Sequence, residues 1–228
     1  MSKRTKAAWQ QFETKVQAVT TNKQLIELIM IGARELVAAH KKPLNPKGGN
    51  DDVQTPQSLA DAIVKHFAPY GRCLEPCAGE NAFVRAMKDF VPQNGSPSPG
   101  VWNVTRFEIK EGSDWLQWEM PADFPRFDWC ITNPPWSKFR PFLAKCMETC
   151  ENVVFLDKLN AWGTSARLDM IEAAGWEIVE KARVKQPRKP WPQMGMQLAA
   201  VHVRRCQTVR QHPGHLGEAK ITRIDWTP

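Results

Sequence analysis

Phe127-Asp128-Trp129-Cys130-Ile131-Thr132-Asn133-Pro134-Pro135-Trp136 is the stretch that decides the fold of this 228-residue chain. Residues 127–132 form a short apolar run, which predicts a buried strand. The two prolines that follow fix φ and remove two backbone donors, so the strand ends in a rigid, extended turn. This turn sets an amide beside a large indole, which suits a planar group that carries an amine. A polar loop with a surface tryptophan is the alternative interpretation.

Strand and helix patterns alternate on both sides of this turn. We expect further strands at 72–75, 101–109, 153–157, 176–184 and 197–204. Helices are expected to begin at Thr55-Pro56 and to cover 81–90, 138–150 and 165–174. The alternation predicts an α/β, Rossmann-like fold, in which a mainly parallel sheet has helices on both faces.

Two helical stripes are expected to pack on this sheet. The first has Leu59, Ile63 and Phe67 on one side of its helix. The second consists of Phe139, Phe142, Leu143 and Cys146. Phe139 is therefore interpreted as a core residue rather than a wall of a binding site.

The chain is expected to have two parts. Residues 1–50 form a basic extension, with helices at Ala7–Val19 and from Thr21-Asn22, and a linker rich in proline and glycine. Residues 51–228 form one globular domain, since the length suits one well-packed core.

Composition narrows the class of protein. No apolar run approaches the ~20 residues that span a bilayer, and the basic N-terminus lacks the apolar core of a secretory signal. The six cysteines are scattered and complete no metal site, so we expect free thiols, no bound metal and a cytoplasmic protein.

The net charge of +7 is unevenly distributed. Residues 1–49 hold nine Lys and Arg against three acids, and residues 181–217 hold eight with no acid, whereas 50–180 hold twelve against nineteen. A net-acidic centre with two basic flanks favours a polyanionic partner, although charged residues also simply solvate surfaces.

Polar residues fall where several of the expected strands end. Glu75, Glu108, Asp114 and Asn133 all lie at one edge of the inferred sheet. Ligands of α/β proteins bind outside the carboxyl ends of the strands, and an acid after the second strand can meet ribose hydroxyls. The small-residue loop at Ala78-Gly79 would let a ligand approach the backbone, although it lacks the G-x-G-x-x-G pattern of dinucleotide binders.

These elements together resemble the amino-methyltransferases that use S-adenosylmethionine, and most closely the DNA adenine-N6 family. The motifs are Gln54-Thr55-Pro56, Glu75-Pro76-Cys77-Ala78-Gly79, Glu108, Asp114-Trp115-Leu116 and Asn133-Pro134-Pro135-Trp136. The resemblance covers about residues 51–204 and is to the small forms found in bacteria and their viruses. It implies a seven-stranded sheet with an antiparallel last strand, 176–184 and 197–204 being the final hairpin, and makes 51–228 the catalytic domain.

The resemblance also implies the site. It places the cofactor against Gln54, Thr55, Pro56, Glu75, Pro76, Ala78, Gly79, Glu108, Asp114 and Asn133, with Glu108 on the ribose and Asp114 at the adenine edge. It makes Asn133, Pro134, Pro135 and Trp136 the catalytic motif. Asn81 departs from the family, which has a second glycine there, but Asn tolerates positive φ better than most residues.

The chemistry of such a motif follows from its residue types. The exocyclic amine of a nucleobase is a poor nucleophile because its lone pair is delocalised into the ring. The side-chain oxygen of Asn133 and the carbonyl of Pro134 can accept both amine hydrogens and so free the lone pair for attack on the methyl group. Trp136 would stack on the base, which a duplex must first flip out of its helix.

The loop that joins the last two expected strands is basic. Lys185, Arg188, Lys189 and an exposed Trp191 suit contact with a nucleic-acid backbone and a stacked base. A stiff, proline-rich loop without a partner is the alternative.

The expected function is thus methyl transfer to adenine N6 in DNA. The alternatives are a methyltransferase acting on RNA adenine N6 or guanine N2, a protein glutamine methyltransferase, and a non-catalytic nucleic-acid-binding protein of the same fold. The basic flanks favour a nucleic acid over a protein substrate.

Overall fold

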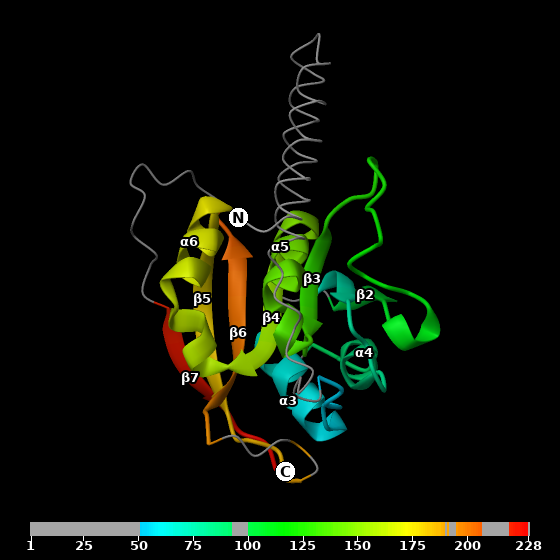
Figure 1. Cartoon of the computed structure of the whole chain (residues 1–228). Coiled ribbons are helices and arrows are strands. Elements are labelled where there is room, and N and C mark those ends of the chain that lie inside the picture. The colour runs from blue at the N-terminus through cyan, green and yellow to red at the C-terminus, as the bar shows by residue number, and fades with distance from the viewer. Residues whose placement is uncertain (1–50, 93–99, 190, 192–194, 207–218, 228) are drawn as a thin grey trace, which may run out of the picture. The chain divides into compact units, whose positions relative to one another are not determined.

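The computed structural model describes residues 51–92, 100–189, 191, 195–206 and 219–227 (Figure 1). These residues belong to a compact unit, Asn50–Pro228. The two helices and the linker predicted for 1–50 lie outside the described residues. The division into an extension and a catalytic domain therefore stays a prediction.

A seven-stranded sheet organises the unit, in the order β2-β1-β3-β4-β6-β5-β7. Its strands are β1 Gly71–Glu75, β2 Val101–Arg106, β3 Phe127–Thr132, β4 Cys150–Lys158, β5 Trp176–Val184, β6 Leu198–Arg205 and β7 Lys220–Ile224. Neighbouring strands are parallel except that β6 runs antiparallel to both β4 and β5. The predicted Rossmann-like fold is confirmed, including the antiparallel strand of the hairpin made by β5 and β6.

The two ends of the sheet differ from a simple doubly wound order. The Rossmann arrangement 3-2-1-4-5-6 has a strand outside the second one, whereas β2 is the edge strand here. The other edge is β7, which pairs in parallel with β5 and which the sequence did not predict. Three of the five β7 side chains are exposed and only Ile224 is buried. The strand therefore has little of the apolar alternation by which a strand is predicted from sequence.

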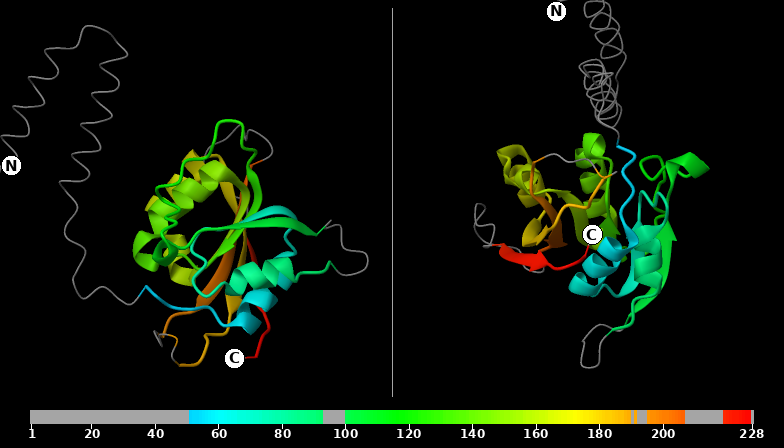
Figure 2. Two further views of the ribbon diagram at one scale, coloured as in Figure 1. Left: turned by 90° about the vertical axis from the view of Figure 1, so that its right-hand side faces the viewer. Right: turned by 90° about the horizontal axis from the view of Figure 1, so that it is seen from below.

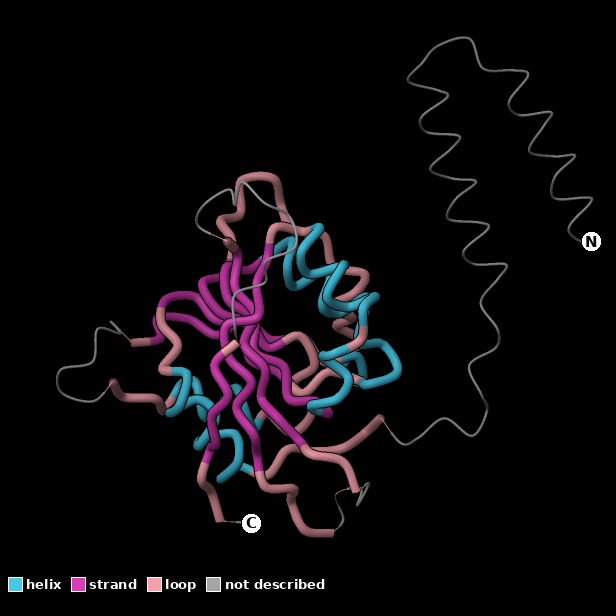
Figure 3. The backbone as a smooth tube through the Cα atoms, turned by 90° about the vertical axis from the view of Figure 1, so that its left-hand side faces the viewer, coloured by secondary structure: helices cyan, strands magenta, loops and turns pink. Residues whose placement is uncertain are grey.

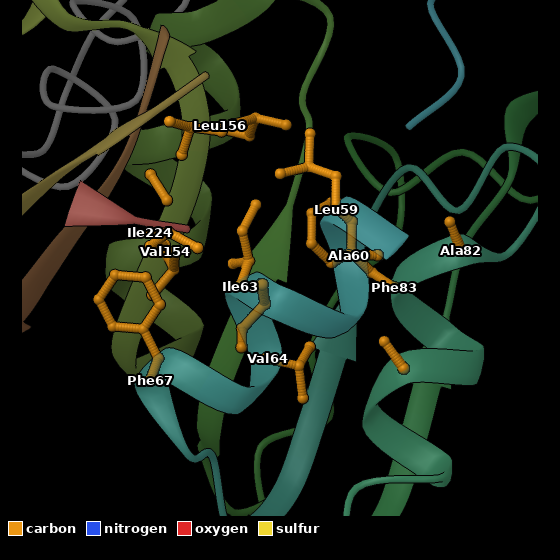
Figure 4. Close-up of a cluster of buried hydrophobic side chains, with 14 of the residues drawn as sticks. Leu59, Ala60, Ile63, Val64, Phe67, Ala82, Phe83, Val154, Leu156 and Ile224 are labelled. Atoms are coloured by element: carbon orange, nitrogen blue, oxygen red, sulfur yellow. The ribbon is translucent and has the colours of Figure 1, made fainter. Parts of the chain in front are cut away.

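Helices cover both faces of the sheet (Figures 2 and 3). They are α3 Gln57–Phe67, α4 Ala82–Lys88, α5 Phe139–Thr149 and α6 Ser165–Ala173, with 3-10 turns η1 Ile109–Glu111, η2 Trp136–Lys138 and η3 Leu159–Gly163. One buried cluster joins α3 and α4 to the sheet, and a second joins α5 and α6 to it. Figure 4 shows Leu59, Ile63 and Phe67 of α3 within the first cluster, beside Leu156 and Ile224.

The four helices predicted after residue 50 are present, with one correction at the start of α3. Pro56, not Thr55, is the N-cap residue, and no side-chain hydrogen bond caps the helix. The stripe Phe139, Phe142, Leu143 and Cys146 is buried as expected. Within the described part of the chain, no helix is long and apolar enough to cross a membrane.

The strand directions bring the proposed site together. Because six of the strands are parallel, Glu75, Thr132 and Lys158 end their strands at the same edge of the sheet, which we call the carboxyl edge. The antiparallel β6 starts at this edge, since Leu198 is the register partner of both Lys158 and Val184. The loop between β5 and β6 is therefore on the same side as the turn after β3.

Candidate functional site

A cavity of about 270 Å³ opens at the carboxyl edge. It lies between the segment that precedes α3, the β1–α4 loop, the residues after β2 and the turn after β3. Its lining includes seven of the predicted cofactor residues: Gln54, Thr55, Glu75, Ala78, Gly79, Glu108 and Asn133. Segments up to about 80 residues apart in the sequence thus form one site, as the parallel strands require.

Three predicted cofactor residues do not line this cavity. Pro56 is the N-cap of α3, and Pro76 is buried in the β1–α4 loop. Asp114 instead accepts a hydrogen bond from its own neighbour, with 2.9 Å between Leu116 N and Asp114 Oδ1. Because β2 ends at Arg106, earlier than expected, and η1 follows, the chain turns away before Asp114 and the carboxylate caps a local turn.

The cavity also has lining residues that the sequence analysis missed. Ile109 is 59% exposed and directly follows Glu108, so an apolar side chain stands beside the buried acid. Lys138, two residues after the catalytic motif, adds a cation, and Asp51 and Asp52 add two acids. Proximity to the predicted motifs is the only sequence signal that could have found them.

Asn133 lines the cavity and carries a buried acceptor without a partner among the described residues. Its Nδ2 donates to the Val53 carbonyl at 3.1 Å, which fixes the orientation of the amide. Its Oδ1 is buried and has no hydrogen-bond partner among the described residues. A buried acceptor without a partner costs about 1–3 kcal/mol, and a catalytic role or an unseen water or ion is among the explanations for such an atom.

Glu75 is a buried acid beneath the cavity, only 1% exposed. Its Oε1 accepts from Thr132 Oγ1 at 2.5 Å and from the Cys77 N–H at 3.1 Å. Burial raises the pKa of Glu75 to about 8, and the hydrogen bonds from Thr132 and Cys77 only partly oppose this. The carboxyl group is therefore mainly protonated at pH 7.

We expect Glu75 to make the unfolding free energy depend on pH. Its pKa is higher in the folded protein, about 8, than the ordinary 4.5, so the folded state holds the extra proton between these values. Stability should fall as pH rises through this window, by on the order of 1 kcal/mol per pH unit.

The variant Glu75→Gln isolates this effect. The amide oxygen can still accept from Thr132 and Cys77, so the fold should be retained while the pH dependence flattens. Urea unfolding at pH 5.5, 7 and 8 measures this. If the unfolding free energy changes equally with pH in both proteins, the raised pKa is contradicted.

Glu108 ties two sides of the cavity together. Its Oε2 accepts from the Gly79 N–H at 2.6 Å and its Oε1 from the Lys110 N–H at 3.0 Å. Gln54 also packs closely on the β1–α4 loop, because a Cβ added at Gly79 would lie 2.4 Å from Gln54 Oε1. The φ of Gly79 is +48°. Only glycine fits there without a shift.

Asn81 stands in this loop where the resemblance implies a second glycine. Its φ of 65° is left-handed, so the loop is formed despite the side chain. The Oδ1 atom of Asn81 is buried and unpartnered among the described residues.

The Trp136 side chain is fixed by contacts within the protein and is not a freely exposed surface for stacking. It is partly buried against the core that α3 forms, and its Nε1 donates to the Leu156 carbonyl at 3.4 Å. The Lys158 ammonium lies over the ring, 4.7 Å from its centroid. A base can stack on that face only after this ammonium has moved aside.

The basic loop after β5 reaches this tryptophan. Lys185, Arg188 and Lys189 are exposed, as predicted. The prediction of an exposed Trp191 is wrong, since it is 4% exposed and packs in the first core cluster. Its ring meets Trp136 edge to face, with 6.4 Å between centroids, so Trp191 anchors the loop rather than offering a stacking surface.

Comparisons with known proteins concern the fold. No protein-family model and no curated sequence matches the chain. A candidate class I S-adenosylmethionine-dependent methyltransferase from Listeria monocytogenes is 13% identical, with a TM-score of 0.49 over 90% of this chain and 73% of the other. A candidate RNA methyltransferase from Pyrococcus horikoshii is 15% identical, with a TM-score of 0.46 over 78% and 98%. The M protein of the type I restriction enzyme EcoKI is 11% identical, with a TM-score of 0.45 over 95% and 58%.

Proposed function

We propose that this chain is a methyltransferase that transfers a methyl group from S-adenosylmethionine to the exocyclic N6 amine of adenine in DNA. Residues 51–228 would form its catalytic domain, and 1–50 a basic extension. The observation that carries the proposal is the Oδ1 atom of Asn133, directly before the rigid Pro134-Pro135 turn. This atom is buried and has no partner among the described residues. An amine hydrogen would satisfy that atom.

The cavity fits the proposed cofactor in three respects. The loop at Ala78 and Gly79 carries no side chain larger than a methyl group, so a ligand can approach the backbone. Glu108 supplies a carboxylate with acceptor capacity beyond its two present hydrogen bonds, which suits ribose hydroxyls. Ile109 supplies an exposed apolar surface for the adenine ring.

Bound S-adenosylmethionine supplies a methyl group on a sulfonium, which is a good leaving group. The residues of this chain have to position the amine and prepare its lone pair. Asn133 would accept one amine hydrogen, because the bond from its Nδ2 to the Val53 carbonyl leaves Oδ1 without a partner among the described residues. The Pro134 carbonyl is the proposed acceptor for the second amine hydrogen.

No positioned base is needed to complete the reaction. The methylated ammonium is acidic and loses its proton readily to solvent. Glu75, the most buried acid of the site, is mainly protonated at neutral pH, and the proposed reaction assigns it no role as the base. Catalysis by this chain rests on orientation and on hydrogen-bond acceptance.

The choice of adenine in DNA rests on the resemblance of the motifs, and the charge of the chain favours a nucleic acid over a protein substrate. Lys185, Arg188 and Lys189 are exposed on the loop whose Trp191 contacts Trp136, so cations stand close to the catalytic motif. Cations on a nucleic-acid enzyme neutralise phosphates and supply most of the salt-dependent affinity.

One assay tests the proposed function. The full chain is incubated with methyl-labelled S-adenosylmethionine and, separately, with duplex DNA, RNA of the same sequence, and a glutamine-containing protein. We expect label in N6-methyladenine after digestion of the DNA. Label found in RNA or in protein instead of DNA would show that the proposed substrate is wrong. Cofactor that binds without methyl transfer to any of the three would contradict catalysis.

Trp136 offers a test of base stacking. In Trp136→Leu the apolar core contact is kept but the aromatic face is lost, so KM for DNA should rise about fivefold. This is the lower end of the usual ~1–3 kcal/mol per stacked base, because stacking displaces the Lys158 ammonium. Trp136→Phe should restore most of the affinity. A Leu variant with unchanged KM and normal thermal unfolding would contradict stacking on Trp136.

A further inference from the structure

A second cavity, of about 710 Å³, opens where β5 and β7 end. It lies between residues 183–186, 195–198 and 223–226, and it shares no lining residue with the cofactor cavity. Figures 1 and 2 show the described C-terminal end beside the loop that joins β5 to β6. Because β5 and β7 are parallel, this second cavity also lies at the carboxyl edge.

The lining of this cavity is basic. Arg183, Lys185 and Arg223 face a single acid, Asp225. Arg183 and Arg223 are register partners on adjacent parallel strands, so two like charges stand side by side on an exposed sheet face. No ion pair joins either arginine to a described residue. Like charges in this position destabilise a sheet unless an anion bridges them.

An indole stands at the rim of the same cavity. Trp226 is partly buried against the core, and its Nε1 donates to the Lys185 carbonyl at 2.9 Å. This bond holds the C-terminal segment on the basic loop. A fixed aromatic ring beside three cations is the combination that binds a nucleic-acid strand, since the cations neutralise phosphates and a base stacks on the ring.

The loop links this cavity to the catalytic motif. Gln197 Nε2 donates to the Val184 carbonyl at 2.8 Å and closes the base of the loop at the cavity. Farther along the loop, Trp191 packs on Trp136. A nucleic-acid strand whose target base lies at Asn133 can thus continue along Arg188 and Lys189 to the second cavity.

We propose that the cavity between β5 and β7 binds nucleotides that flank the target base. Arg183, Lys185 and Arg223 would bind phosphates of the substrate strand, and Trp226 would stack on one of its bases. This inference rests on the proposed function, because it assumes a nucleic-acid substrate. It assigns a role to β7 and to the residues after it, which the cofactor site does not use.

The salt dependence of DNA binding tests the phosphate contacts. Arg183→Gln/Arg223→Gln is compared with Lys65→Gln/Lys88→Gln, which makes the same charge change at exposed positions on α3 and α4. The probe is a fluorescein-labelled 20-nucleotide DNA that contains adenines, single-stranded and duplex in separate titrations, with RNA of the same sequence as a third.

In the arginine variant, the slope of log K against log salt should fall by about 1.5, since each phosphate contact contributes ~0.7–0.9. Affinity near physiological salt should fall roughly tenfold. The KM for DNA should rise, whereas kcat at saturating DNA and the Kd for the cofactor should stay unchanged. The lysine variant should change the slope much less. Equal slopes and KM values in the two variants would overturn the proposal.

Trp226 separates stacking from charge. Trp226→Ala should weaken DNA binding about fivefold or more without changing the salt slope, and Trp226→Phe should restore most of it. If Trp226→Phe binds as weakly as Trp226→Ala while both unfold at the wild-type temperature, stacking on this ring is overturned.

The outcomes also separate this inference from the proposed function. Wild-type protein that methylates DNA, with an unaltered slope in the arginine variant, would overturn the second site alone. Wild-type protein that binds the oligonucleotides without methylating them would contradict the proposed reaction. The slope comparison would still decide the binding site. A wild type that binds none of the three probes would overturn both.

Discussion

The variant Asn133→Ala should lose methyl transfer by about 10²–10³-fold in kcat, which is the usual cost of removing one preorganised hydrogen-bonding partner of a reacting group. The Oδ1 atom of Asn133 is buried and has no partner among the described residues, so its proposed partner is the substrate amine. The cofactor Kd should change little, because the walls around Gly79 and Glu108 remain.

Two variants make this result specific. Asn133→Asp keeps an acceptor oxygen but loses the hydrogen bond to Val53, so it should retain more activity than Asn133→Ala. Asn103→Ala removes an exposed amide on β2 and should leave kcat unchanged. Steady-state rates at saturating DNA and cofactor measure these effects. Full activity in Asn133→Ala would remove this residue from the mechanism.

Glu108→Gln should raise the cofactor Kd about 10- to 100-fold. The two carboxylate oxygens accept from two different N–H groups, those of Gly79 and Lys110. A glutamine offers one acceptor oxygen and turns an NH₂ group toward the other donor, so one hydrogen bond to a charged acceptor is replaced by a clash of donors. Hydrogen bonds to charged groups contribute ~1.5–3 kcal/mol, which converts to the expected range.

The control for this change is Glu111→Gln. Glu111 is exposed, and among the described residues it pairs with Arg106 alone, on the surface, where an ion pair contributes little. Isothermal titration with S-adenosylmethionine gives Kd, and thermal unfolding of the cofactor-free protein reports the loss of the loop contacts. If unfolding shifts while Kd stays the same, Glu108 is only a structural tie and its proposed contact with ribose is contradicted.

The elements that the sequence predicted well are those with strong local patterns. The bounds of β3 and β5 agree with the expected ranges, because apolar runs of strand length are readable within a few residues. The stripe on α5 was equally readable, since helical spacing determines which side chains share a face. The positive φ of Asn81 also agrees with the local preference of that residue type.

The errors concern residues whose surroundings come from distant segments. Trp191 has polar and proline neighbours in the sequence, and its burial follows from packing on the core that α3 forms. The contact of Asp114 with the cofactor stays a prediction of the resemblance, and in the structure β2 ends early, the turn η1 follows, and the Asp114 carboxylate accepts from the Leu116 N–H instead of lining the cavity. The short strand β7 needed β5 as a partner to be recognised.

The sequence by itself determined the order of strands and helices from α3 to β6, the rigid turn at Asn133-Pro134-Pro135-Trp136, and the acids that follow neighbouring strands. These depend on periodicity and on the backbone limits of proline, which act over a few residues. Only the tertiary structure decided which atoms are left to bind a ligand. The free Oδ1 of Asn133 depends on Val53, the neutral Glu75 on its burial, and the paired arginines on the register of β5 with β7. Hydrogen-bond partners and desolvation come from segments far apart in the chain, and no local pattern records them.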